Sequence, residues 1–175
     1  MSRNPITLKI WPWEDTAWLL GLLLVYCGAA VAQSVPPADV PGAVNPLVTQ
    51  ANLAQTVCVA GYTAKVRPAV AYTNALKLKK MAALGLRGKP ADFELDHRVD
   101  LAAGGAPSDP ANLWPQPWPE ARLKDRLETY THREMCAGRM TLAQVQAIFL
   151  GDFWAEYDRV AALKHWPPRG ILKAK

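Results

Sequence analysis

The sequence has only three cysteines and three histidines, and it has no Cys-x-x-Cys pair. Structural zinc sites use four cysteine or histidine ligands, often with two cysteines at that close spacing, so the composition argues against zinc. Internal repeats are also absent. A length of 175 residues therefore suits one domain, or one domain with an exported leader.

Acidic residues are missing between Asp39 and Asp92. Basic residues continue through this stretch: Lys65, Arg67, Lys77, Lys79, Lys80, Arg87 and Lys89. With a formal net charge of +5, the chain suits an anionic partner. The basic stretch is either a solvated face or a phosphate-binding surface. For the second alternative, the candidate nucleic-acid contacts are Lys77, Lys79 and Lys80, with Lys124 further along the chain.

The N-terminal region has the pattern of an export signal. Residues 16–34 are uncharged and largely apolar, and they contain the small-x-small cleavage pattern Ala30-Val31-Ala32. We therefore expect residues 1–32 to be a signal peptide and the mature protein to be secreted or periplasmic. No stable membrane association is expected after cleavage. The alternative is a retained leader that anchors the protein in the membrane.

Cysteine usage agrees with export. Cleavage after Ala32 would remove Cys27 and leave Cys58 and Cys136, an even pair in an oxidising compartment. A disulfide between them would close a loop of about eighty residues and stabilise the fold by about 4.5 kcal/mol in the chain-entropy model. The alternative is two buried free thiols.

The first half of the chain predicts few regular elements. Residues 33–46 are rich in Pro, Ala and Val without periodicity, which predicts an extended linker. The β-branched residues within 56–62 predict a short strand. Residues 70–84 carry apolar side chains at helical spacing and predict a helix, which Gly85 ends.

The second half predicts a hairpin followed by helices. Residues 93–99 alternate as a strand does, which places Asp96 and His97 on opposite faces. After a loop at Gly104-Gly105, the return strand begins at Asn112, and we expect Pro115, Pro117 and Pro119 to stop it. Helices are expected over about 119–136, 141–150 and 152–164. The predicted fold class is α+β and mainly helical, a small β-hairpin plus helix with flanking helices, with the domain at 47–165 and a basic tail at 166–175.

Hydrolysis of a phosphodiester needs a water nucleophile, a base and a cation that holds the phosphoryl oxygens. The pattern Asp96-His97, Gly104-Gly105 and Asn112-Leu113, with a helix after it, resembles the HNH signature of ββα-metal nucleases. A longer likeness, over about 48–154, is to small exported bacterial proteins described as HNH-like. The resemblance implies that His97 is the general base, that Asp96 is a metal ligand, and that Asn112 fixes the loop or binds metal.

The third histidine of the HNH pattern is absent. It commonly lies three residues before a lysine on the helix, and here Ala121 stands in that position before Lys124. On an ideal helix, Ala121 shares a face with Asp125, Glu128 and His132. Any of these three could supply the missing ligand, with Glu128 the first candidate and His132 the second. Mg²⁺ or Mn²⁺ is the expected cofactor, because carboxylate and amide oxygens suit hard cations.

Two functions follow from this pattern. The first is a metal-dependent nuclease that acts on DNA or RNA without an obligate protein partner. The second is a non-catalytic exported binding module that keeps the HNH-like fold. Under the second, His97 pairs with a carboxylate, Asn112 serves a turn or a cap, and the charges of the helix are solvated.

Overall fold

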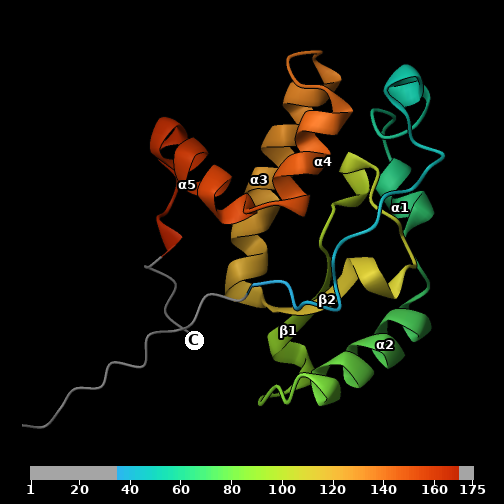
Figure 1. Ribbon diagram of the computed structural model, residues 1–175, viewed down its shortest axis with the longest axis vertical. Helices are drawn as coiled ribbons and strands as arrows, with labels where there is room; N and C mark the ends of the chain where they lie inside the picture. Colours follow the sequence, from blue (N-terminus) through green and yellow to red (C-terminus); the bar gives the residue numbers. More distant parts are fainter. Residues whose placement is uncertain (1–34, 170–175) are drawn as a thin grey trace, which may run out of the picture. The chain divides into compact units, whose positions relative to one another are not determined.

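The structure is a computed structural model that describes residues 35–169, so the predicted signal peptide lies outside the described residues. Within the described residues, a two-stranded antiparallel hairpin is accompanied by five α-helices and several short 3₁₀ turns, which confirms the predicted α+β, mainly helical class (Figure 1). The strands and helices are β1 (Phe93–His97), β2 (Leu113–Pro117), α1 (Tyr62–Val66), α2 (Val70–Ala83), α3 (Trp118–Cys136), α4 (Leu142–Leu150) and α5 (Phe153–Lys164). In Figure 1 the hairpin lies between α3 and α2, and both helices contact both strands.

Local sequence signals account for the ends of the C-terminal helices. Thr141 Oγ1 accepts a hydrogen bond from the Gln144 amide at 3.1 Å and completes a capping box at the start of α4. Asp152 Oδ1 accepts from the Trp154 amide at 3.0 Å at the start of α5. These caps satisfy amide donors that have no partner within the helix, so each helix begins where the sequence predicts.

The return strand β2 runs through two prolines that we expected to stop it. β2 pairs with β1 along one edge only, with Leu95 opposite Pro115. The carbonyl of Asn112 accepts from the Arg98 amide, so Asn112 and every second residue after it turn their backbone groups toward β1. Pro115 and Pro117 alternate with those residues and face away from β1. A missing N–H on the unpaired edge costs no ladder bond.

Residues 56–62 form no strand, contrary to expectation. A 3₁₀ helix (Gln50–Gln55) precedes them, and the Cys58 amide turns back to the Leu53 carbonyl at 2.9 Å. The apolar content reflects burial rather than strand pairing, because Val57 is 2 % exposed and belongs to the core. Cys58 is joined to Cys136 at the end of α3 by a disulfide with a Cα–Cα distance of 5.7 Å. The predicted disulfide is therefore present.

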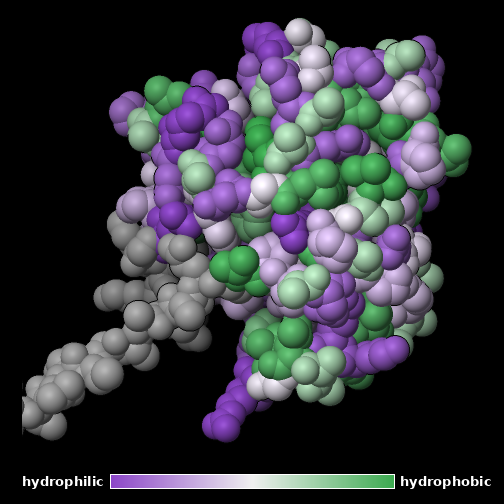
Figure 2. Space-filling view, in the orientation of Figure 1, coloured by the Kyte–Doolittle hydropathy of each residue, from purple (hydrophilic) through white to green (hydrophobic). Residues whose placement is uncertain are grey.

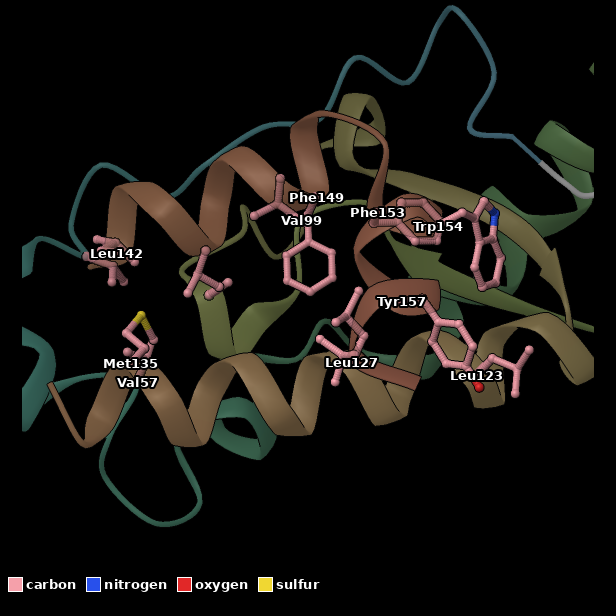
Figure 3. Close-up of a cluster of buried hydrophobic side chains, with 14 of the residues drawn as sticks. Val57, Val99, Leu123, Leu127, Met135, Leu142, Phe149, Phe153, Trp154 and Tyr157 are labelled. Carbon is pink, nitrogen blue, oxygen red and sulfur yellow. The ribbon is translucent and has the colours of Figure 1, made fainter. Parts of the chain in front are cut away.

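The core lies where α3, α4 and α5 meet. Figure 3 shows Leu123 and Leu127 projecting from α3 toward aromatic side chains of α4 and α5, while Met135 lies near Leu142 of α4. Phe149 and Tyr157 are both 0 % exposed. The outer side of α5 is mainly hydrophilic (Figure 2), as expected for an amphipathic helix with one buried face.

The described part of the predicted linker, residues 35–46, is packed against the domain. Val40 is 0 % exposed, and Val44 forms a β-bridge with Gly105. The Arg98 guanidinium donates to the Val40 carbonyl at 2.7 Å and to the Leu150 carbonyl at 2.5 Å. Residues 35–46 form no helix or strand. The hydrogen bonds of their backbone and the burial of Val40 nevertheless make this segment part of the fold.

The first residues of the predicted basic tail also pack on the domain. Tyr157 donates from its hydroxyl to the Pro167 carbonyl at 2.7 Å, and Trp166 contacts the rings of Tyr130 and Tyr157. Within residues 35–169, no helix is both long and apolar enough to span a membrane.

Candidate functional site

The side chain of Lys124 is the centre of a buried charged cluster between α3 and β1. Its ammonium lies 2.9 Å from Asp96 Oδ2 and also contacts Glu128 Oε1, one helical turn later on α3. It donates a further hydrogen bond to the His97 carbonyl at 2.7 Å. The Lys124 side chain is 0 % exposed. Two of the predicted metal ligands, Asp96 and Glu128, therefore lie close together. The cation that they contact is the ammonium of Lys124 and not a metal ion.

Asp96 and His97 point in different directions, as strand alternation predicts. Asp96 faces α3, where Oδ2 pairs with Lys124, while Oδ1 accepts from the His97 backbone amide at 2.7 Å. The His97 ring is directed to the loop after β1, where Nε2 lies 2.9 Å from the Pro107 carbonyl oxygen. A carbonyl oxygen only accepts, so Nε2 carries the proton and Nδ1 keeps its lone pair.

Burial and the neighbouring charges shift the pKa values of His97, Lys124 and Glu128. Burial lowers the pKa of His97, which is 6 % exposed, so its neutral form predominates at neutral pH. Burial opposes the charged form of Lys124, but Asp96 and Glu128 outweigh it and raise the pKa of that ammonium. Burial raises the pKa of Glu128, and the charge of Asp100 raises it further. Carboxylates thus outnumber ammonium groups in this buried region.

Glu94 lies on the face of the hairpin that carries Asp96, two residues before it. Burial, together with the charges of Asp96 and Asp125, raises the pKa of Glu94 to about 7. Gln116 is opposite Glu94 in the register and therefore lies on the same face. Its side chain is fully buried, and among residues 35–169 neither atom of its amide has a hydrogen-bond partner.

Asn112 holds the loop between the two strands. Its side-chain oxygen accepts from the Val99 amide at 2.8 Å and the Ala43 amide at 3.3 Å, and its nitrogen donates to the carbonyls of Val99 and Ala106, both at 3.0 Å. Asn112 is 0 % exposed. The hydrogen-bonding capacity of the Asn112 side chain is thus used on backbone groups, a geometry that fits the loop-fixing role and leaves no lone pair for a metal ion.

Two glycines allow this loop to close. Gly104 has a φ of +72°, a conformation that L side chains rarely adopt. A Cβ on Gly105 would lie 1.8 Å from the Val99 carbonyl oxygen and 2.9 Å from Asn112 Nδ2. The Gly-Gly pair of the sequence motif is thus required by the approach of the loop backbone to Asn112.

His132 lies outside the Lys124 cluster, contrary to its assignment as a metal ligand there. Its Nε2 donates to the Val57 carbonyl at 2.9 Å, and its ring neighbours the disulfide. Potential ligand atoms of Cys58, His132 and Cys136 all lie within 4.8 Å of one another, which is close enough for one metal ion. With the disulfide closed, the sulfurs are not thiolates, and thiolates are the form that binds metal.

The four lysines assigned to nucleic-acid binding have different environments. Lys124 is buried, and Lys80 is 7 % exposed and 3.6 Å from Asp39, so neither presents its ammonium to a phosphate backbone. Lys77 donates to the carbonyls of Pro90 and Phe93 at 2.9 and 3.1 Å. Only Lys79 of the four is exposed. Lys79 is therefore the lysine of this set whose environment best suits contact with a phosphate backbone.

The predicted metal ligands do not form one coordination sphere. Asp96 and Glu128 contact Lys124, Asn112 is saturated by backbone groups, and His132 lies beside the disulfide. The residues present therefore do not fit the Mg²⁺ or Mn²⁺ site that the resemblance implies.

Sequence reasoning missed the role of Lys124 in this cluster. The spacing did contain a signal. Lys124 is three residues from the buried Ala121 and Leu127, which places it within the buried stripe of α3 rather than on its solvated side. Two further features could not be predicted from the sequence. The contact of His97 with the Pro107 carbonyl depends on the path of the loop, and the position of the Gln116 amide depends on the register of the strands.

Comparison with models of known protein families, with curated proteins and with solved structures found no match to this chain. The functional argument therefore depends on the geometry of the cluster and its surroundings.

Proposed function

We propose that this protein hydrolyses phosphodiester bonds of nucleic acid, with His97 as the general base. The hydrogen bond from His97 Nε2 to the Pro107 carbonyl carries the proposal. It fixes the tautomer in which Nδ1 has a free lone pair, and burial favours the neutral ring at neutral pH. A neutral imidazole held in one orientation is suited to taking a proton from water.

Exposed basic residues near His97 support an anionic substrate. Arg67 is exposed, and it lies close enough for its charge to lower the pKa of both His97 and Glu94. The exposed Lys79 on α2 and the exposed Arg87 and Lys89 after it extend the basic residues along the chain. These residues belong to the basic stretch, which has no acidic residue, so the attraction for phosphate comes from this side of the hairpin rather than from the carboxylates around Lys124.

Export to the periplasm or the medium is part of the same proposal. The disulfide between Cys58 and Cys136 fits an oxidising compartment. The apolar residues 16–34 with their cleavage pattern supply the route.

The second candidate is a binding module that has lost catalysis. The pairing of Asp96 with Lys124 favours it, because this carboxylate is already neutralised and fully partnered. The same basic surface would then bind an anionic polymer without cleaving it.

Nicking of supercoiled plasmid and cleavage of a single-stranded RNA test the two candidates. The oxidised chain is assayed with Mg²⁺, with Mn²⁺ and with EDTA. His97→Gln keeps an amide that can donate to the Pro107 carbonyl but has no basic nitrogen, so cleavage should fall by at least about 100-fold. His165→Asn is the matched control, because His165 is exposed at the end of α5 with a φ of 54°, which asparagine tolerates.

Wild type and His165→Asn should cleave equally. If both are as inert as His97→Gln on DNA and on RNA, the hydrolase proposal fails. Retarded migration of the same nucleic acids with the inert protein would then support the binding module.

A further inference from the structure

The ammonium of Lys124 is surrounded in the way that a bound cation is. Its three N–H donors are matched by three oxygens, from Asp96, Glu128 and the His97 backbone. The rings of Phe149 and Phe153 lie 5.4 and 6.0 Å from the nitrogen, with their negative faces available to the charge. Every favourable interaction of this ammonium is therefore supplied by the protein.

The same oxygens suit a divalent cation. Mg²⁺, Mn²⁺ and Ca²⁺ are bound by carboxylate and carbonyl oxygens at roughly 2.0–2.6 Å. Two carboxylates and one carbonyl already converge on the position of the Lys124 nitrogen. A third carboxylate, Asp100, is near enough for its charge to act on both Lys124 and Glu128. The cluster thus contains more carboxyl groups than the one ammonium contacts.

A separate observation indicates spare ligand capacity on this face of the hairpin. Gln116 is 0 % exposed, and both atoms of its amide are without partners within residues 35–169. The register places it on the same face as Glu94 and Asp96. Buried amides are normally hydrogen-bonded, so an unpartnered one beside carboxylates marks a position where a ligand or its water could bind.

We propose that Lys124 is the resident cation of this carboxylate site, and that it excludes divalent ions from it. Removing the ammonium should convert the cluster into a site for Mn²⁺ or Mg²⁺, with Asp96, Glu128 and the His97 carbonyl as ligands. Ala121, one turn before on α3, is buried and contributes no ligand atom. This inference goes beyond the proposed hydrolysis and does not depend on it, because its measurement is metal binding.

The test compares Mn²⁺ binding by the full oxidised chain and four variants, one of them Glu128→Gln alone, using calorimetry and the melting temperature in Mn²⁺ and in EDTA. Lys124→Ala opens the space and frees the oxygens, so it should bind one Mn²⁺ saturably and melt at a higher temperature as Mn²⁺ is raised. Lys124→Met is the matched control, because its side chain fills the space without a charge. Lys124→Ala combined with Glu128→Gln removes one ligand and should lose the Mn²⁺ response.

Wild type should show no Mn²⁺ response that depends on Glu128. Tight binding by wild type that Glu128→Gln abolishes would overturn the proposal, and so would a folded Lys124→Ala that ignores Mn²⁺. If Lys124→Ala does not fold in EDTA, it is refolded with Mn²⁺ and followed by near-ultraviolet circular dichroism. Recovery in Lys124→Ala but not in the double variant supports the resident cation, and failure to recover rejects it.

Discussion

Replacing Asn112 with alanine separates its structural role from the metal-binding role that the motif implies. The side chain makes four hydrogen bonds to backbone groups, three of them at 2.8 to 3.0 Å. In Asn112→Ala, the amide of Val99 and the carbonyls of Val99 and Ala106 lose their partner while still buried. Each such group costs about 1–3 kcal/mol, which gives a loss of about 3–5 kcal/mol when partial relaxation is allowed.

Urea unfolding followed by circular dichroism measures this loss as a change in the free energy of unfolding. Asn45→Ala is the control, because the Asn45 side chain makes an exposed hydrogen bond to the Leu47 amide, and its removal should cost less than about 1 kcal/mol. A loss below about 1 kcal/mol in Asn112→Ala would refute the loop-fixing account.

Asn112→Asp adds a second comparison. It keeps the accepting oxygen but places a carboxylate oxygen against the carbonyls of Val99 and Ala106, so it should be destabilising at pH 7. Protonation restores one donor, so the loss relative to wild type should shrink toward pH 4. A metal ligand would behave differently, because an added carboxylate would strengthen Mn²⁺ binding.

Two further predictions concern stability. The Cys58–Cys136 disulfide spans 78 residues, so replacing both cysteines with serine should lower the free energy of unfolding by about 4.5 kcal/mol, and a reductant should lower the midpoint of wild type but not of this variant. The pKa of Glu94 rises from 4.5 in the unfolded state to about 7 in the folded state. Between pH 4.5 and about 7, the folded state therefore keeps a proton on Glu94 that the unfolded state has released. The free energy of unfolding falls as pH rises through this range. Glu94→Gln should therefore be more stable than wild type at pH 8 and gain little at pH 4.5; equal differences at both pH values, measured by urea unfolding, would contradict the assignment.

The helices and the first strand could be predicted because their signals are local. The apolar spacing of residues 70–84, the Thr141 capping box and the alternation of residues 93–99 each depend on neighbours in sequence. The behaviour of residues 35–46 and 56–62 could not be predicted in this way. Prolines and β-branched residues indicate which regular elements are disfavoured or favoured, but not whether a segment packs in the core.

The sequence predicted which residues belong to the site better than it predicted which groups those residues contact. Asp96 and Glu128 lie together as expected, because one ends a strand and the other lies on the helix that follows the hairpin. That they meet on Lys124 depends on the rotation of α3 relative to the hairpin, which no local pattern encodes. The same rotation directs His132 to the Val57 carbonyl and not to Asp96.

The hydrogen bonds of Arg98 have a consequence for the order of events during synthesis. This one guanidinium joins the carbonyl of Val40 to those of Phe149 and Leu150, and these partners are 51 to 58 residues away on either side. A chain that emerges from its N-terminus can make the Val40 contact once Arg98 has appeared, but it cannot complete the junction until Leu150 has appeared. Contacts of such long range slow folding, since loop closure must precede them. The part of the fold that Arg98 ties together should therefore be completed late, after Leu150 has appeared.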